Sequence, residues 1–342
     1  MPPTRRPTYP PLLSIDFLAR ESRQLPFLAL SLTLSRLALG YTWSPLDTFS
    51  LGFFLFSLLL YFLWRIDQRI AWGSPREVDW EEEVVLITGG SSGLGRVIAD
   101  TYAMRGVGVA VLDVRPFYEG GEGEKDGGVR FYRVDVGDEE AVREVRARVE
   151  KDLGPPTVLI NNAGIVNGKT LLEVESKALE KNFRVNLLSH FYMLRAFLPR
   201  MIERKSGTVV TVASVLGDLG ASQLSDYTAA KAGLIAMHTS LRSELADAGH
   251  DQIKTILVKP GQLSTPLFKG VQTPSSFMGP VVEPIDLAQA IVAKIDAGQS
   301  GVIALPFYAD CIEWLSVLPY GTQKVMRWLS GVDRAMKTFK SG

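Results

Sequence analysis

Two kinds of hydrophobic pattern divide this chain. Between residues 81 and 308, short apolar runs rich in valine and isoleucine alternate with longer segments of helical periodicity. Apolar strands separated by helices predict an α/β domain with a doubly wound, seven-stranded parallel sheet, because helices cover both faces of such a sheet. The seven runs are VVLIT from 84, VAVLDV from 109, VRFYRVDV from 129, TVLINNA from 157, GTVVTVAS from 207, TILVKP from 255 and VIALPF from 302.

The second pattern is an apolar region before this domain. Residues 48–64, TFSLGFFLFSLLLYFLW, carry no charge over 17 residues, which is near the lower limit for a helix that spans a bilayer. Residues 25–43 are also apolar but contain Arg36, and an arginine at bilayer depth is costly. We predict a membrane anchor within 25–64, either as one span or as a hairpin that turns around residues 41–47.

Flanking charge favours the hairpin. Positively charged flanks tend to stay in the cytosol, and arginines lie on both sides of the apolar region. A core helix of a soluble protein is the alternative. The arginines are Arg5, Arg6, Arg20 and Arg23 before the region and Arg65, Arg69 and Arg76 after it.

These patterns divide the chain into five parts: a Pro- and Arg-rich segment 1–24, the anchor 25–64, a linker 65–80, the folded domain 81–308 and a C-terminal segment 309–342. In the last part, apolar and basic positions recur at helical spacing. They predict an amphipathic helical tail that lies on an anionic membrane, or packs on the domain or a second subunit. The apolar set is Val325, Trp328, Leu329, Val332, Met336 and Phe339, and the basic set is Lys324, Arg327, Arg334, Lys337 and Lys340.

Composition narrows the classes of function. Lys+Arg and Asp+Glu both total 37 in 342 residues, so no net charge favours nucleic acid as a partner. The single cysteine, Cys311, excludes an intramolecular disulfide. Three scattered histidines, His190, His238 and His250, predict neither a metal site nor a catalytic histidine.

Two loops interrupt the alternation. Residues 115–128, RPFYEGGEGEKDGG, are too rich in glycine and charge for a helix, so the second crossover is predicted to be a flexible loop. Residues 263–284 are rich in proline, serine and glycine and follow the sixth strand. Ligands bind at the carboxyl edge of such sheets, so we expect this loop to cover the substrate.

The first strand ends in a glycine-rich turn, TGGSSGLG at 88–95, and a helical pattern follows directly. A turn in this context forms a phosphate cradle, because backbone amides and the helix N-terminus attract a pyrophosphate. Gly89 would permit the tight turn, Gly93 the approach of the phosphates and Gly95 close helix packing. A Rossmann-type dinucleotide site is predicted.

Asp113 closes the second strand 18 residues after Gly95. At this spacing a carboxylate accepts hydrogen bonds from ribose hydroxyls and repels a 2′-phosphate. The prediction is therefore NAD, while the nearby Arg115 leaves NADP open.

Tyr227 and Lys231 stand four residues apart in YTAAK. On a helix they share a face, so the ammonium can lie beside the phenol and stabilise the phenolate. A tyrosine with a pKa of about 10 in water would then exchange protons nearer neutrality. Such a pair is common on helix surfaces, so it indicates a catalytic site only in combination with the surrounding motifs.

Taken together, the motifs resemble the short-chain dehydrogenase/reductase family over residues 81–308. The hydrophobic N-terminus, WLSVLP and the basic tail further resemble its membrane-associated branch, that of retinol dehydrogenase type 10 and 17β-hydroxysteroid dehydrogenase types 11 and 13. The matching motifs, in order, are TGGSSGLG at 88, Asp135 in VDV, NNAG at 161, Asn186 in RVNLLSHF, Ser214 in VASV, YTAAK at 227 and PG at 260.

The resemblance implies four catalytic roles. Tyr227 would give a proton to the reacting oxygen or remove it, and Ser214 would hydrogen-bond that oxygen. Lys231 would lower the tyrosine pKa and hold the nicotinamide ribose, and Asn186 would position a water that links the lysine to solvent.

A cofactor-binding set is implied as well. Asp135 would contact the adenine, Asn162 would brace the cofactor, and residues 260–265 would seat the nicotinamide carboxamide. The loop at 115–128 departs from the family pattern, and this departure affects the contacts that are expected with the adenosine part of the cofactor. The full set is Gly89, Ser91, Ser92, Gly93, Leu94, Gly95, Asp113, Asp135, Val136, Asn162, Ala163, Gly164, Tyr227, Lys231, Pro260, Gly261 and Thr265.

The sequence thus predicts a membrane-bound oxidoreductase that transfers a hydride between NAD(H) and the CH–OH/C=O group of a retinoid, sterol or long-chain alcohol. Its catalytic domain is expected in the cytosol, at the endoplasmic reticulum or at lipid droplets, and the resemblance implies a homodimer. One alternative is an NADPH-dependent carbonyl reductase of lipid or secondary metabolism. Another is a nucleotide-sensing scaffold on a lipid surface, without turnover.

Overall fold

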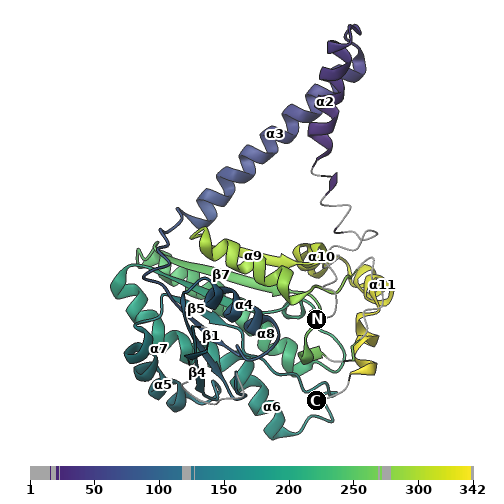
Figure 1. Ribbon diagram of the computed structural model, residues 1–342. Coiled ribbons are helices and arrows are strands. Elements are labelled where there is room, and N and C mark those ends of the chain that lie inside the picture. The colour runs from purple at the N-terminus through teal and green to yellow at the C-terminus, as the bar shows by residue number, and fades with distance from the viewer. Residues whose placement is uncertain are drawn as a thin grey trace, which may run out of the picture.

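The computed structural model describes Asp16 and residues 21–22, 24–117, 125–126, 128–268, 270–271 and 279–339. It contains a helical hairpin that rises from an α/β domain (Figure 1). The prediction for the N-terminal segment, and parts of those for the two loops at 115–128 and 263–284, lie outside the described residues.

One sheet forms the centre of the domain, with strand order β3-β4-β2-β1-β5-β6-β7-β8. Seven strands run parallel, as predicted, and β3 pairs antiparallel with β4 at the edge. β3 lies inside the glycine-rich loop, where no regular structure was predicted. The strands are β1 Val84–Thr88, β2 Gly108–Asp113, β3 Lys125–Asp126, β4 Val129–Arg133, β5 Val158–Asn161, β6 Gly207–Val212, β7 Ile253–Pro260 and β8 Gly301–Leu305.

Helices cover both faces of the sheet, which explains why the strands are apolar throughout. On one face α4 and α9 enclose a core with residues such as Ile98 and Ile291, and on the other α5, α7 and α8 enclose a core with residues such as Phe197 and Leu234. The helices are α4 Gly93–Met104, α5 Glu139–Leu153, α6 Ser176–Phe183, α7 Ser189–Arg204, α8 Ser225–Asp247 and α9 Pro284–Asp296.

The strand order reverses at β1. Leu86 in the middle of β1 pairs with Ala110 of β2 on one side and with Leu159 of β5 on the other. The connections after β1 and β5 therefore leave the sheet toward opposite faces. Ligands of doubly wound sheets bind at the carboxyl edge of the strands beside such a reversal.

A buried ion pair attaches the start of the domain to the sheet. The side chains of Arg76 and Glu83 are 1% and 6% exposed, and Arg76 Nη1 lies 2.6 Å from Glu83 Oε1. Arg76 Nε also donates to Thr208 Oγ1 at 2.9 Å, and the Thr157 hydroxyl donates to Glu83. These contacts join the segment before β1 to β6 and to the residue preceding β5.

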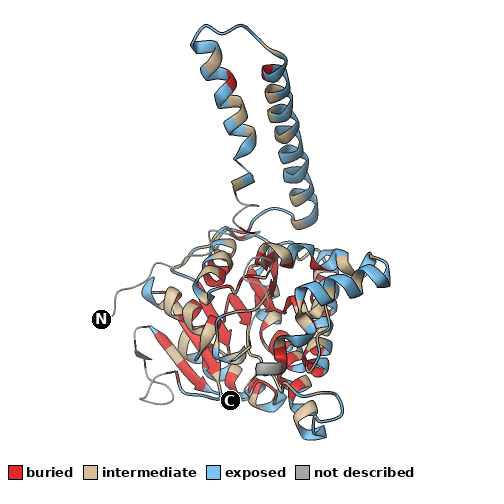
Figure 2. Cartoon of the chain, turned by 90° about the vertical axis from the view of Figure 1, so that its right-hand side faces the viewer, coloured by how far each residue is buried: buried red, intermediate tan, exposed pale blue. Residues whose placement is uncertain are grey.

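Two antiparallel helices, α2 Leu25–Ala38 and α3 Pro45–Trp72, form the hairpin. Figure 2 shows most of its residues exposed and most of the others intermediate, in contrast to the buried centre of the domain. By length and composition α3 is the one helix among the described residues that is able to cross a membrane, and 6% of its apolar window is buried.

After β8 the chain forms α10 Phe307–Cys311, the 3-10 helix η4 Ile312–Val317, helix α11 Tyr320–Ser330 and the 3-10 helix η5 Val332–Thr338. The sequence predicted one amphipathic helix across Val325 to Phe339. Instead, α11 stops at Gly331, which adopts a φ of 65°. Val325, Trp328 and Leu329 remain exposed, whereas Met336 is buried in the domain.

Candidate active site

The glycine-rich turn lies at the carboxyl end of β1 and leads into α4. A Cβ on Gly95 would lie 2.6 Å from Asn162 Nδ2, and one on Gly93 would lie 3.2 Å from Thr265 Cγ2. Ser92 is the N-cap of α4 but makes no side-chain capping hydrogen bond. Because glycines let the backbone of the turn pack this closely, and the N-terminus of a helix lies at the turn, the turn fits a pyrophosphate.

Thr88 and Asn162 hold this turn against the end of β5. Asn162 Nδ2 donates to the carbonyls of Thr88 and Gly89 at 3.1 and 3.0 Å. The Thr88 hydroxyl accepts the backbone N–H groups of Asn162 and Ala163, each at 3.0 Å. Asn162 thus braces the turn itself. Thr88 is the first residue of TGGSSGLG, but no role was predicted for it from the sequence.

Asp113 lies at the end of β2, next to the same turn. Its Oδ2 accepts the N–H of Ser91 at 3.0 Å and its Oδ1 accepts the N–H of Arg115 at 3.0 Å. The Ser91 hydroxyl donates to the Arg115 carbonyl at 2.8 Å. A carboxylate fixed in this position can receive ribose hydroxyls beside the pyrophosphate cradle.

Ser214, Tyr227 and Lys231 converge from β6 and α8. The Ser214 hydroxyl lies close enough to the Tyr227 phenol to lower its pKa and accepts the N–H of Leu216 at 3.1 Å. Lys231 Nζ donates to the Val212 carbonyl at 2.8 Å and lies 5.7 Å from the centroid of the Tyr227 ring. The structure therefore brings together the three residues predicted from separate motifs.

Burial is the main cause of the pKa shifts of Tyr227 and Lys231. It raises the pKa of Tyr227 above its ordinary value, and the hydrogen bond from Ser214 offsets this only in part. Burial also lowers the pKa of Lys231 to about 7. The sequence predicted a lowered phenol pKa. Here desolvation of the phenolate outweighs stabilisation by its neighbours, in the direction opposite to that expectation.

Asn186 lies in a π-helical turn, Arg184–Leu188, between α6 and α7. Its Oδ1 accepts the N–H of Ile165 at 2.9 Å, and its Nδ2 donates to the Ile165 carbonyl and to Asn182 Oδ1, both at 2.8 Å. The amide thus holds the backbone of the loop after β5. Asn182, which is fully buried, was missed by the sequence analysis. π-turns inside α-helices are frequent at functional sites.

The remaining predicted residues border the same edge of the sheet. A Cβ on Gly164 would lie 3.1 Å from Asn186 Oδ1 and 4.0 Å from Lys231 Nζ. Gly261, which follows Pro260, donates its N–H to the Leu305 carbonyl at 2.7 Å. Asp135 Oδ1 accepts the N–H of Gly137 at 2.9 Å, and Val136 beside it is buried. Leu94 is buried beneath the glycine-rich turn.

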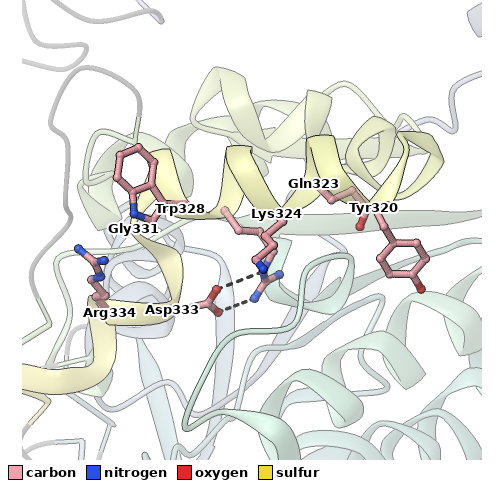
Figure 3. Close-up of a pocket in the computed structure, with 8 residues that line it drawn as sticks. Tyr320, Gln323, Lys324, Trp328, Gly331, Asp333 and Arg334 are labelled. Carbon is pink, nitrogen blue, oxygen red and sulfur yellow. Dashed lines mark hydrogen bonds and ion pairs between the residues drawn. The ribbon is translucent and has the colours of Figure 1, made fainter.

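In the described part of the chain, no group of three or more His, Cys, Asp or Glu side chains is placed to hold a metal ion. His190 is buried, and burial and the positive charge of Lys231 hold its pKa well below the ordinary value. A hollow of about 530 Å³ lies beside α11, and its lining includes Asp333 and Arg327, which form an ion pair. Figure 3 shows Asp333 and other residues of this lining. Its lining residues include none of the predicted site residues.

A phosphate cradle at the end of β1, a carboxylate at the end of β2 and a Ser–Tyr–Lys group share one edge of a doubly wound parallel sheet. This fold and arrangement define an oxidoreductase that uses a nicotinamide dinucleotide.

The chain belongs to the short-chain dehydrogenase/reductase family, since residues 83–275, more than half of its length, match the family described as "short chain dehydrogenase". Short-chain dehydrogenase/reductase family 16C member 6 of Bos taurus is 32% identical, over 86% of this chain and 93% of its own. Human retinol dehydrogenase 10 is 33% identical, over 78% of this chain and 87% of its own. The predicted resemblance to the retinol dehydrogenase 10 branch is thereby confirmed.

Solved structures agree on the fold. A short-chain dehydrogenase from Streptomyces avermitilis superposes with a TM-score of 0.59 at 27% identity, covering 74% of this chain and 98% of its own. A 4-hydroxyisoleucine dehydrogenase complexed with NADH superposes with a TM-score of 0.58 at 23% identity. The match covers 65% of this chain and 97% of that dehydrogenase.

Proposed function

We propose that this protein is a membrane-attached, NAD(H)-dependent dehydrogenase that interconverts an alcohol and a carbonyl on a lipophilic substrate. One observation carries the proposal: the Ser214–Tyr227–Lys231 group is buried among apolar side chains and lies at the same sheet edge as the glycine cradle. The names of the retinol dehydrogenase relatives point to the same class of substrate.

Each member of the group has a distinct part in this proposal. Tyr227, kept protonated at neutral pH by its raised pKa, gives its proton to a carbonyl oxygen, and Ser214 hydrogen-bonds that oxygen. The nicotinamide, when bound, supplies or accepts the hydride. Lys231 stays in place through Val212, and its pKa of about 7 lets it return a proton to the tyrosine at neutral pH. Asn186 fixes the loop beside them.

A series of primary alcohols, retinol and a hydroxysteroid, presented in phospholipid vesicles, tests this function directly. NADH absorbance should rise with at least one lipophilic substrate and NAD. Turnover with NADP alone would instead support the alternative carbonyl reductase. Tight NADH binding without any turnover across the series would support the nucleotide-sensing scaffold.

The preference for NAD is assigned to Asp113. We expect Asp113→Asn, which removes the charge and retains the side-chain shape, to reduce the ratio of kcat/KM for NAD over NADP about 10-fold or more, because a carboxylate repels the 2′-phosphate. Steady-state rates with both cofactors measure the ratio. Asp100→Asn on the outer side of α4 is the matched control and should leave it unchanged. An unaltered ratio in Asp113→Asn would remove this assignment.

Attachment through the hairpin is supported by its exposed apolar surface. α3 is 28 residues long, roughly 42 Å at the rise of an α-helix, which exceeds the hydrocarbon core of a bilayer. Large apolar side chains along both helices, such as Leu32 and Phe56, are more than half exposed. A soluble protein does not leave such a surface open to water.

The polar groups at the tip support a hairpin over a single span. Arg36 on α2 lies 3.5 Å from Asp47 on α3 and 5.6 Å from the centre of the Tyr41 ring. Asp47 also accepts the N–H of Ser44 at 2.9 Å. The arginine that made the first stretch costly is thus paired with a carboxylate of the second stretch, and pairing reduces the cost of a charge in lipid.

Deletion of residues 1–64 should move the protein from the membrane pellet to the soluble fraction, because it removes α2 and most of the apolar part of α3. Ultracentrifugation and immunoblotting of both fractions measure this. The truncated chain keeps Arg76 and should still bind NADH, which serves as the control for folding. If it stays with the membrane, the C-terminal segment, not the hairpin, provides the attachment.

Pairing of two subunits is also part of the proposal. Leu188, the last residue of the π-helical turn, is 38% exposed, and Phe191 in the first turn of α7 is 42% exposed. Their exposure supports a homodimer through the helices that follow Asn186.

A further inference from the structure

The far C-terminal end of the chain packs on the tyrosine of the active site. Met336 of η5 is 4% exposed and forms one apolar cluster with Tyr227 of α8 and with Leu224, the residue before α8. Phe268 completes the contact from another side, with its ring edge-on to Tyr227 at 5.7 Å between centroids. A segment outside the predicted catalytic domain therefore covers the catalytic group.

Phe339 extends this cover over the loop after β5. Its ring lies directly against Gly168, where a Cβ would come within 3.3 Å of Phe339 Cγ and closer to other ring carbons. Gly168 has a φ of 65°, so glycine provides both the space and the backbone conformation here. Further apolar side chains pack around the cluster: Val166, Leu216, Ala221 and Val271.

The path of the chain explains how these side chains reach the site. α11 ends at Gly331, and the yellow C-terminal segment then runs down the side of the domain toward α6 (Figure 1). Arg327 fastens the turn, since it donates to the Gly220 carbonyl at 2.8 Å and pairs with Asp333 at 2.5 Å (Figure 3). The segment beyond this point is the 3-10 helix η5, whose hydrogen-bond geometry is poorer than that of an α-helix.

We propose that residues 331–339 form the wall of the substrate site opposite Ser214 and Tyr227, with Met336 and Phe339 as the residues that contact the hydrocarbon part of the substrate. The proposal rests on the proposed function and names the residues that set its specificity. Tyr227 is 4% exposed beside these side chains, so a substrate that reaches the phenol comes into contact with them. Met336 is suited to that place, because its unbranched thioether chain adapts to different apolar shapes.

Two substitutions of Met336 in the full chain test the wall. With NAD and primary alcohols from 1-butanol to 1-hexadecanol, Met336→Trp should lower the ratio of kcat/KM for hexadecanol over butanol about 10-fold or more, because it fills the site. Met336→Ala should shift the same ratio in the opposite direction. Thermal unfolding and NADH binding of each variant check that the fold is intact.

Met326→Ala is the matched control. Met326 lies on α11, five residues before the Gly331 turn, and is 40% exposed, so its loss should leave the ratio unchanged. Ratios within about twofold of the wild type in both Met336 variants would overturn the proposal.

A second measurement needs no turnover. The holoenzyme with NAD is irradiated with a hexadecanol that carries a diazirine at its far end, and modified peptides are identified by mass spectrometry. Labelling should fall within residues 331–339, and an excess of plain hexadecanol should suppress it. If suppressible labelling is confined to other segments, residues 331–339 do not contact the substrate, even if wild-type turnover confirms the proposed function. Conversely, labelling of this segment without turnover would refute the proposed dehydrogenase activity but support the contact between residues 331–339 and the hydrocarbon chain.

Discussion

Replacing Tyr227 with phenylalanine should lower kcat by about 10³-fold, within the usual range for removal of a general acid or base. The substitution removes only the hydroxyl, while the ring keeps its contacts with Met336 and Phe268. The cofactor cradle lies on other elements, at the ends of β1 and β2. The dissociation constant for NADH should therefore change by less than about threefold.

Single-turnover kinetics with NAD and fluorescence titration with NADH measure the two quantities. Tyr102→Phe is the matched control, because Tyr102 is a buried tyrosine of α4 whose hydroxyl has no hydrogen-bond partner among the described residues. It should retain wild-type activity. If Tyr227→Phe keeps activity within about tenfold of the wild type, another group moves the proton, and the proposed role of the phenol is wrong.

Replacing Glu83 with alanine should lower the free energy of unfolding of the domain by about 3–5 kcal/mol, the usual cost of breaking a buried ion pair. The change leaves the Arg76 guanidinium, 1% exposed, without its carboxylate in a place that water does not reach. Arg76 holds the start of the domain to β6 through Thr208. The loss should therefore appear as one cooperative shift of the whole domain.

Thermal unfolding of the detergent-solubilised full chain, followed by tryptophan fluorescence, measures the shift. Glu82→Ala provides a neighbouring control. Glu82 is 74% exposed and lies 3.8 Å from Arg204, and an exposed pair of this kind contributes about 0–1 kcal/mol. Equal shifts for the two variants would show that the buried ion pair contributes no more to the stability of the domain than the exposed pair does.

The sheet was predictable from the sequence because its strands are buried on both faces. Each of the seven apolar runs became one parallel strand, and none was assigned to a helix. β3 was not predictable, since its pairing with β4 depends on the backbone and not on apolar side chains. The family pattern also located the Ser214, Tyr227 and Lys231 group, because its members occur in a fixed order relative to β6 and α8.

The residues that surround this group could not be predicted from the sequence. Helical periodicity alone does not distinguish a face that rests on lipid from one that packs on the domain. The stripe from Val325 to Phe339 was therefore predicted as one helix, with the membrane, the domain and a second subunit as alternative partners, although Gly331 divides it. The burial of Tyr227 was not predictable for the same reason, since it depends in part on Met336, which is far away in the sequence.

The π-turn at Arg184–Leu188 also determines how the chain tolerates length changes. It is one residue wider than a regular α-turn, and each residue of an α-helix rotates the side-chain direction by about 100°. A single-residue deletion there would rewind the turn into regular helix and swing Asn186 off the Ile165 backbone, or else rotate all of α7 against the sheet. Related sequences aligned to this one should therefore show no one-residue gap across this turn, even where the surrounding residues differ.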